Sequence, residues 1–286
     1  VILTTCQQEF TQFYPEPGLI EHDPEEIWLA AANTLKEVSE RMEEMGHDIV
    51  CIGITNQRET SIIWDQDSGK PLHNAIVWQD RRTTERCQEL EKENYLNEIR
   101  SKTGLVIDPY FSATKFEWMI NSLQNKTDFS LGTVDSWLIW KLTDGKVHAT
   151  EPSNASRTLL MDLEKTIWDS SLLEIFGIKE SSLPEICDSF FNFGETKGLD
   201  FLPDGIPITG ILGDQQAALF GQAGINEGDI KCTYGTGAFM LLNTGNKIHY
   251  SNNGLLSTVA YRKDNKTQYA LEGSCYIAGA AVQWLR

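Results

Sequence analysis

Two neighbouring stretches of the sequence combine the residue types that phosphoryl transfer requires. Residues 213–222 (GDQQAALFGQ) place Asp214 between a predicted strand and a predicted helix. Residues 231–239 (KCTYGTGAF) then place Thr236 and Gly237 in a glycine turn between two apolar strands. A carboxylate can accept the proton of an alcohol, and backbone N–H groups in a glycine turn can bind phosphate. The pair of stretches therefore predicts a kinase.

Each of the two features also has a purely structural interpretation. Asp214 precedes a predicted helix and can serve as its N-cap. The Gly-Thr-Gly turn at residues 235–237 can simply join two strands of a hairpin. The sequence contains no G-x-x-x-x-G-K-[ST] phosphate loop, and the turn lacks the third glycine of a dinucleotide fingerprint. Neither of these common nucleotide sites is expected.

Composition excludes several classes of function. The chain has 286 residues, of which 41% are hydrophobic, and a formal net charge of −17. Such an acidic chain offers no basic surface for nucleic acid or anionic lipid, and no apolar run approaches the roughly 18 residues of a membrane span. The six cysteines never form a C-x-x-C pair, so we expect buried thiols in a reducing cytoplasm rather than a zinc site.

Hydrophobic patterning predicts helices and strands in alternation. Asp23, Pro24 and Glu26 have the pattern of a helix start with a capping box, and apolar residues at spacings of three and four follow to Met42. We expect further helices near 81–96, 112–123, 134–142, from 168–171 onward, and at 278–286. Strands are predicted at 1–10, 49–54, 60–64, 75–78, 206–212, 230–234, 238–242, 255–261 and 268–271. This order indicates an α/β fold with a mixed sheet.

Six segments, in this order along the chain, resemble the FGGY carbohydrate kinase family, and within it the branch that phosphorylates glycerol. They are residues 55–60 (TNQRET), 74–79 (NAIVWQ), 103–105 with 108–112 (TGL, DPYFS), 133–140 (TVDSWLIW), 154–158 (NASRT) and 213–216 (GDQQ). The resemblance covers nearly the whole chain. It implies a ribonuclease-H-like, actin-like ATPase fold with a mixed sheet flanked by helices, and ATP-dependent phosphorylation of glycerol.

The resemblance also implies roles for particular residues. Those expected to bind the glycerol hydroxyls are Arg58, Glu59, Tyr110, Asp214 and Gln215, with Trp78 and Phe239 as an apolar wall against the carbon chain. Asp214 is the expected catalytic base. Thr236 and Gly237 are expected beside the β- and γ-phosphates of ATP, with Mg²⁺ bridging phosphate oxygens and no dedicated protein metal site.

Ordinary structural roles remain open for several of these residues. Arg58 and Glu59 can form a solvated ion pair at the end of a strand, Trp78 can belong to the core, and Tyr110 can pack behind Pro109. For Trp78 and Phe239, a packing role and a role in the substrate wall can coexist.

The resemblance further implies how the chain relates to a whole kinase. We expect residues 1–286 to form the N-terminal, substrate-binding domain, lacking its first strands and phosphate loop, with the C-terminal adenine-binding domain absent. On that interpretation the chain is inactive alone, while the full-length protein is a cytoplasmic homo-oligomer. An FGGY kinase for another polyol or sugar, and a non-catalytic actin-like binding domain, are the alternatives.

Overall fold

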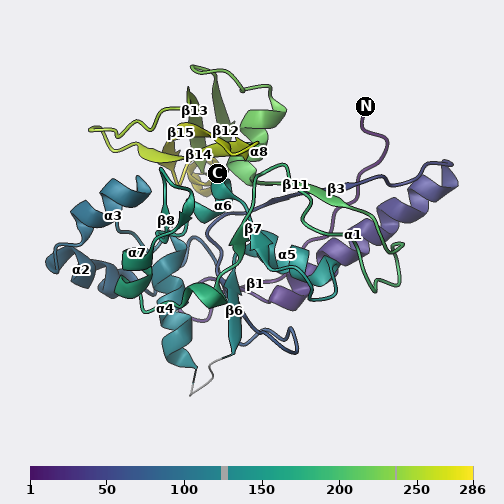
Figure 1. Cartoon of the computed structure of the whole chain (residues 1–286), viewed down its shortest axis with the longest axis horizontal. Coiled ribbons are helices and arrows are strands. Elements are labelled where there is room, and N and C mark those ends of the chain that lie inside the picture. Colours follow the sequence, from purple (N-terminus) through teal and green to yellow (C-terminus); the bar gives the residue numbers. More distant parts are fainter. Residues whose placement is uncertain (124–127, 236, 286) are drawn as a thin grey trace.

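The computed structural model describes residues 1–123, 128–235 and 237–285 (Figure 1). The helices are α1 (Pro24–Glu44), α2 (Thr84–Lys92), α3 (Leu96–Thr103), α4 (Ser112–Ser122), α5 (Val134–Leu142), α6 (Pro152–Ala155), α7 (Ser170–Ile175), α8 (Asp214–Gly221) and α9 (Gly279–Leu285), with a 3₁₀ turn η1 (Glu180–Ser182). In the described part of the chain, no helix combines the length and the apolarity needed to cross a bilayer.

The strands are short in the first part of the chain and longer near its end. They are β1 (Gln12–Phe13), β2 (Glu21–His22), β3 (Ile52–Asn56), β4 (Ile62–Asp65), β5 (Ala75–Ile76), β6 (Phe129–Gly132), β7 (Ala149–Thr150), β8 (Met161–Asp162), β9 (Ile167–Trp168), β10 (Glu185–Ile186), β11 (Ile208–Gly213), β12 (Ile230–Tyr234), β13 (Ala238–Gly245), β14 (Leu256–Lys263) and β15 (Lys266–Cys275).

Parallel and antiparallel pairings both occur, as the predicted mixed sheet requires. Strand β3 pairs in parallel with β11, so the segments that follow the two strands leave the sheet at the same edge. Strands β12 to β15 form an antiparallel sheet in the order β12-β13-β15-β14, which lies above the β3–β11 pair in the view of Figure 1. The functional residues described below lie where these two groups of strands meet.

Helix starts follow the capping signals of the sequence. Asp23 is the N-cap of α1 and accepts a hydrogen bond from the backbone N–H of Glu25, with Pro24 at the first helical position. Glu26 does not close the expected capping box, because its carboxylate accepts from the N–H of Thr11 instead. The helix predicted from residues 168–171 onward is α7, and Asp169 is its N-cap.

Two further expectations drawn from the sequence are wrong. Residues 1–10 form no strand, and the side chains of Val1, Ile2 and Leu3 are exposed. A strand needs a hydrogen-bonded neighbour, and alternation alone does not supply one.

Cys87 and Cys187 are buried as expected, but Cys51, Cys232 and Cys275 are exposed free thiols.

The core lies in separate clusters that support the site from two sides. One cluster packs α2, α3 and α4 against β4 and β6 and includes Phe111, Phe116 and Leu131. Tyr110 belongs to the same cluster and is only 4% exposed. A second cluster joins α1, α5 and β11 through Trp28, Ile139 and Ile208. The segments at the carboxyl ends of β3 and β11 therefore start from rigid elements.

Candidate active site

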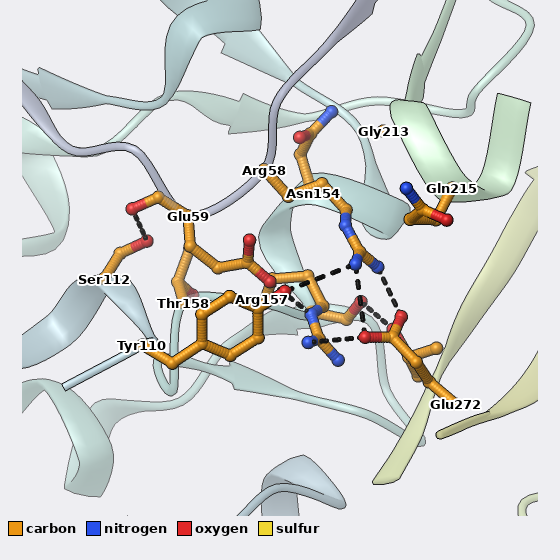
Figure 2. A network of polar contacts seen from close by, with 12 residues as sticks. Arg58, Glu59, Tyr110, Ser112, Asn154, Arg157, Thr158, Gly213, Gln215 and Glu272 are labelled. Atoms are coloured by element: carbon orange, nitrogen blue, oxygen red, sulfur yellow. Dashed lines mark hydrogen bonds and ion pairs between the residues drawn. The ribbon is translucent and has the colours of Figure 1, made fainter. Parts of the chain in front are cut away.

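Side chains from five distant segments converge at the carboxyl ends of β3 and β11 (Figure 2). Arg58 and Glu59 follow β3, and Tyr110 precedes α4. Asp214 and Gln215 open α8 directly after β11. Two residues that the sequence did not single out complete the group, namely Arg157 after α6 and Glu272 on β15.

A tight backbone turn aims both Arg58 and Glu59 inward. Glu59 has a φ of +58°, and the N–H of Thr60 donates to the carbonyl of Arg58 at 2.7 Å. This is the i→i+2 hydrogen bond of a γ-turn, whose positive-φ form is rare and strained. The carbonyl of Glu59 accepts from the hydroxyls of Ser61 and Ser112, each at 3.1 Å. These hydroxyls hold the strained turn in place.

Arg58, Glu59, Arg157 and Glu272 form a buried group that we call the arginine–glutamate cluster. Glu272 accepts from Arg58 at 2.5 and 3.1 Å, and from Nη2 of Arg157 at 3.0 Å. Glu59 accepts from Nε of Arg157 at 2.6 Å. Arg58 and Glu59 are each 2% exposed and bind other partners, so the solvated ion pair allowed by the sequence is wrong.

The two guanidinium groups and burial act differently on the two acids of the cluster. Burial favours the neutral acid, but the guanidinium groups of Arg157 and Arg58 outweigh it and lower the pKa of Glu272 to about 2. Burial raises the pKa of Glu59, against the opposing effect of Arg58 and Arg157. Glu272 is therefore the permanent counter-ion that lets two guanidinium groups remain buried.

Unused polar atoms of the site suit a ligand that carries hydroxyl groups. Among the described residues, Nη1 of the buried Arg157 has no hydrogen-bond partner. The contact of Glu59 with Arg157 uses one carboxylate oxygen. Burial, and after it the charge of Glu59, raises the pKa of Tyr110, so its phenol stays protonated and can donate. Donors and acceptors thus lie side by side, as a polyol requires.

Asp214 is the accessible acid of the site. Its side chain is 46% exposed, and its Oδ1 lies 3.4 Å from Nε of Arg58. The N-cap of α8 is Gly213 rather than Asp214, and Oδ1 of Asp214 accepts from the N–H of the next residue, Gln215, at 2.8 Å. The N-cap interpretation of Asp214 is therefore wrong.

Aromatic rings line one side of the site. Trp78 is half-buried and packs edge-on against Tyr110 and Phe239, with centroid distances of 5.6 and 6.2 Å. Tyr276, which the sequence did not predict here, lies 5.3 Å from Tyr110 and 6.2 Å from Trp78. Trp78 also packs against the core, which confirms the packing role, while its role in a substrate wall stays a prediction.

The glycine turn is only partly described. Thr236 lies outside the described residues, and the carbonyl of Gly237 accepts from the N–H of Gly235 at 2.8 Å. A Cβ atom on Gly237 would lie 2.7 Å from the carbonyl oxygen of Cys275. Close approach of β15 therefore requires glycine at this position, whatever else the turn binds.

The comparisons with known proteins agree with this geometry. The model of the N-terminal domain of the FGGY family of carbohydrate kinases matches residues 1–221, and that of the C-terminal domain matches residues 230–286. The second match begins where β12 begins. The sequence led us to expect one N-terminal domain over residues 1–286, whereas the family models assign the separate sheet of β12 to β15 to the second domain.

Close relatives cover the chain from end to end. Glycerol kinases of Bdellovibrio bacteriovorus and Carboxydothermus hydrogenoformans are 53% and 51% identical to it over 100% of its length. The chain spans 59% and 58% of the length of these relatives.

Solved structures share the fold. The crystal structure of Plasmodium falciparum glycerol kinase with ADP superimposes with a TM-score of 0.92 at 44% identity, over 97% of this chain and 57% of that one. A gluconate kinase from Lactobacillus acidophilus superimposes with a TM-score of 0.86 at 20% identity, over 98% of this chain and 56% of that one, which shows the fold alone. The predicted actin-like α/β fold is confirmed. From its fold and its family matches, this chain belongs to the FGGY family of carbohydrate kinases.

Proposed function

We propose that the protein carrying this chain transfers the γ-phosphoryl group of ATP to a terminal hydroxyl of glycerol, which gives sn-glycerol 3-phosphate. The observation that carries the proposal is the convergence of Arg58, Glu59, Tyr110, Asp214 and Gln215 at one edge of the sheet. Identity of about 50% to glycerol kinases along the whole chain supports it.

Each side chain has a role in this reaction. Arg58 and Tyr110 donate to glycerol hydroxyls, Glu59 accepts from them, and Trp78 with Phe239 covers the carbon chain. Asp214 takes the proton of the terminal hydroxyl as its oxygen attacks the γ-phosphorus. The bond between that phosphorus and the β-phosphate oxygen breaks, and ADP leaves.

The residues proposed to bind the ATP phosphates are assigned from their chemical groups and from their position in the sequence. Thr236 and Gly237 come shortly after β12 in the sequence, in the predicted glycine turn, and a threonine hydroxyl with backbone N–H groups suits phosphate oxygens. Mg²⁺ would neutralise phosphate charge, and it keeps several waters and needs few protein ligands. The exposed carboxylate of Asp214 is the group of this site that can face such an ion.

A coupled assay of ADP release by the full-length protein tests the proposal. With glycerol, xylulose and gluconate as acceptors, we expect kcat/KM to be highest for glycerol, by about 100-fold. A preference for xylulose or gluconate would assign the site to another sugar or polyol. ATP-independent binding of glycerol without ADP release would indicate a non-catalytic module.

Gly213→Ala is expected to weaken substrate binding through Arg58. A Cβ on Gly213 would lie 2.7 Å from both Cγ and Cδ of Arg58, so the guanidinium must move. Since a shift of about 1 Å can cost about 100-fold, we expect kcat/KM for glycerol to fall by that order. Gly221→Ala, where no heavy atom lies within 4 Å of the added Cβ, is the matched control. Equal activity of both variants would contradict the prediction.

A further inference from the structure

Lys231 is a buried cation beside Asp214 and Gln215. It lies on β12 and is 3% exposed. Its Nζ donates to Oε1 of Gln215, and to Oγ1 of Thr233 at 2.7 Å. Within the described residues, no carboxylate lies within ion-pair distance of this ammonium group. A buried lysine with two neutral partners is unusual, because buried lysines are ordinarily paired with acids.

The contact fixes the orientation of the Gln215 amide. An ammonium group has only donors, so Gln215 must turn its carbonyl oxygen toward Lys231. Its NH₂ group then points the other way, where it donates to Oδ2 of Asp214 at 3.3 Å. Without the lysine, the amide oxygen loses this donor, and the side chain is free to leave the Asp214 carboxylate.

Both oxygens of Asp214 are held as a result. Oδ1 lies near Nε of Arg58 at 3.4 Å and accepts from the N–H of Gln215 at 2.8 Å. Oδ2 accepts from the side chain of Gln215, which Lys231 orients. The carboxylate is thus held in one rotational state, with its exposed side left for a ligand hydroxyl.

The surroundings of the lysine disfavour its charged form. Burial lowers its pKa, and the charge of Arg58 lowers it further, while Asp214, Glu272 and Cys232 act in the opposite direction. A base whose pKa is lower in the folded state binds its proton less tightly there, so the charged form opposes folding at neutral pH. An apolar side chain of similar length would be at least as good for the fold.

We propose that Lys231 is a positioning residue that orients the Gln215 amide and, through it, the Asp214 carboxylate for proton transfer. This rests on the function proposed above. Lys231 acts through Gln215 and touches neither the attacking hydroxyl nor the leaving group.

The test compares Lys231→Met and Lys231→Arg in the full-length protein, with the exposed Lys266→Met on β15 as control. Lys231→Met is expected to lower kcat for glycerol by about 10–100-fold, with an unchanged KM for ATP and an unchanged or higher Tm. Lys231→Arg keeps a donor and a charge and restores at least part of kcat. A wild-type kcat in Lys231→Met, or a loss of kcat matched by a loss of Tm, would overturn the proposal.

A double-mutant cycle with Gln215→Ala shows whether Lys231 acts through that residue. Once Gln215 is removed, Lys231→Met is expected to have little further effect on kcat, whereas additive losses would refute the route through Gln215.

A crystal structure of Lys231→Met gives a readout that does not depend on turnover. We expect the Gln215 side chain to leave Oδ2 of Asp214, and an unmoved side chain would contradict the inference. If the wild-type protein does not phosphorylate glycerol, the proposed function fails, while this structure still decides the positioning role.

Discussion

Asp214→Asn is expected to lower turnover by about 10²–10⁴-fold while the protein stays folded. Asparagine has the same size but cannot take the proton of the attacking hydroxyl. The side chain is 46% exposed, so its replacement leaves no buried charge without a partner. Steady-state kinetics with glycerol and ATP, together with thermal unfolding, measure both parts of the prediction.

The matched control for this variant is Asp264→Asn. Asp264 is an exposed acid in the turn between β14 and β15, with a φ of +52° that asparagine also tolerates. This variant should keep wild-type turnover. Near-normal activity of Asp214→Asn would remove Asp214 from the role of base, and a large loss of Tm would show that the effect is structural.

Glu272→Gln is expected to reduce the free energy of unfolding by about 3–5 kcal/mol, because it removes the buried acid that Arg58 and Arg157 share. Glu272 is 0% exposed and contacts both guanidinium groups. Glycerol binding should weaken as well, since Arg58 loses its fixed position. Denaturant unfolding and calorimetric titration with glycerol measure the two effects.

The pH dependence of stability follows from the same residue. The pKa of Glu272 is about 2 in the folded protein, which is below the ordinary range near 4.3 for an unfolded chain. Its stabilisation is therefore complete above about pH 4.3 and is lost as the pH falls toward 2. In Glu272→Gln this part of the acid dependence should disappear.

Two further variants separate stability from function. Glu164→Gln changes an exposed acid in the turn between β8 and β9 and should alter neither property. The quadruple variant Arg58→Met, Glu59→Leu, Arg157→Met, Glu272→Leu replaces all four charged groups of the cluster with apolar ones, which often restores stability. Stability without glycerol binding in this variant would show that the cluster is retained for its ligand. Glycerol binding equal to wild type would refute that role.

Local signals predicted most of the elements. The capping residue Asp23 with Pro24 gave the start of α1, and residues 134–142 were predicted as the helix that the structure contains. Both depend on interactions within a few residues, which a sequence displays directly. The unpaired segment 1–10 was predicted as a strand because alternation does not say whether a partner strand exists.

The site residues, too, were predicted where a local sequence pattern marks them and missed where their role depends on a distant contact. Arg58, Glu59, Tyr110 and Asp214 lie in segments that resemble a known family, and the structure brings them together. Arg157 also lies in such a segment, residues 154–158, but its contact with Glu272 joins residues 115 positions apart, which no local pattern records. For Glu272 the available signal was an acid within the strand 266–275, because a lone carboxylate inside a sheet requires a cationic partner.

The position of Glu272 in the chain limits how this protein can be divided into functional fragments. Residues 1–221 contain both arginines of the cluster and Glu59, while Glu272, which contacts both arginines, lies in the part matched by the other family model. A recombinant fragment ending at the family boundary would leave the two buried guanidinium groups with Glu59 as the remaining acid of the cluster. A useful split-protein reporter must therefore be divided beyond β15, or be redesigned with a second acid supplied from the first piece.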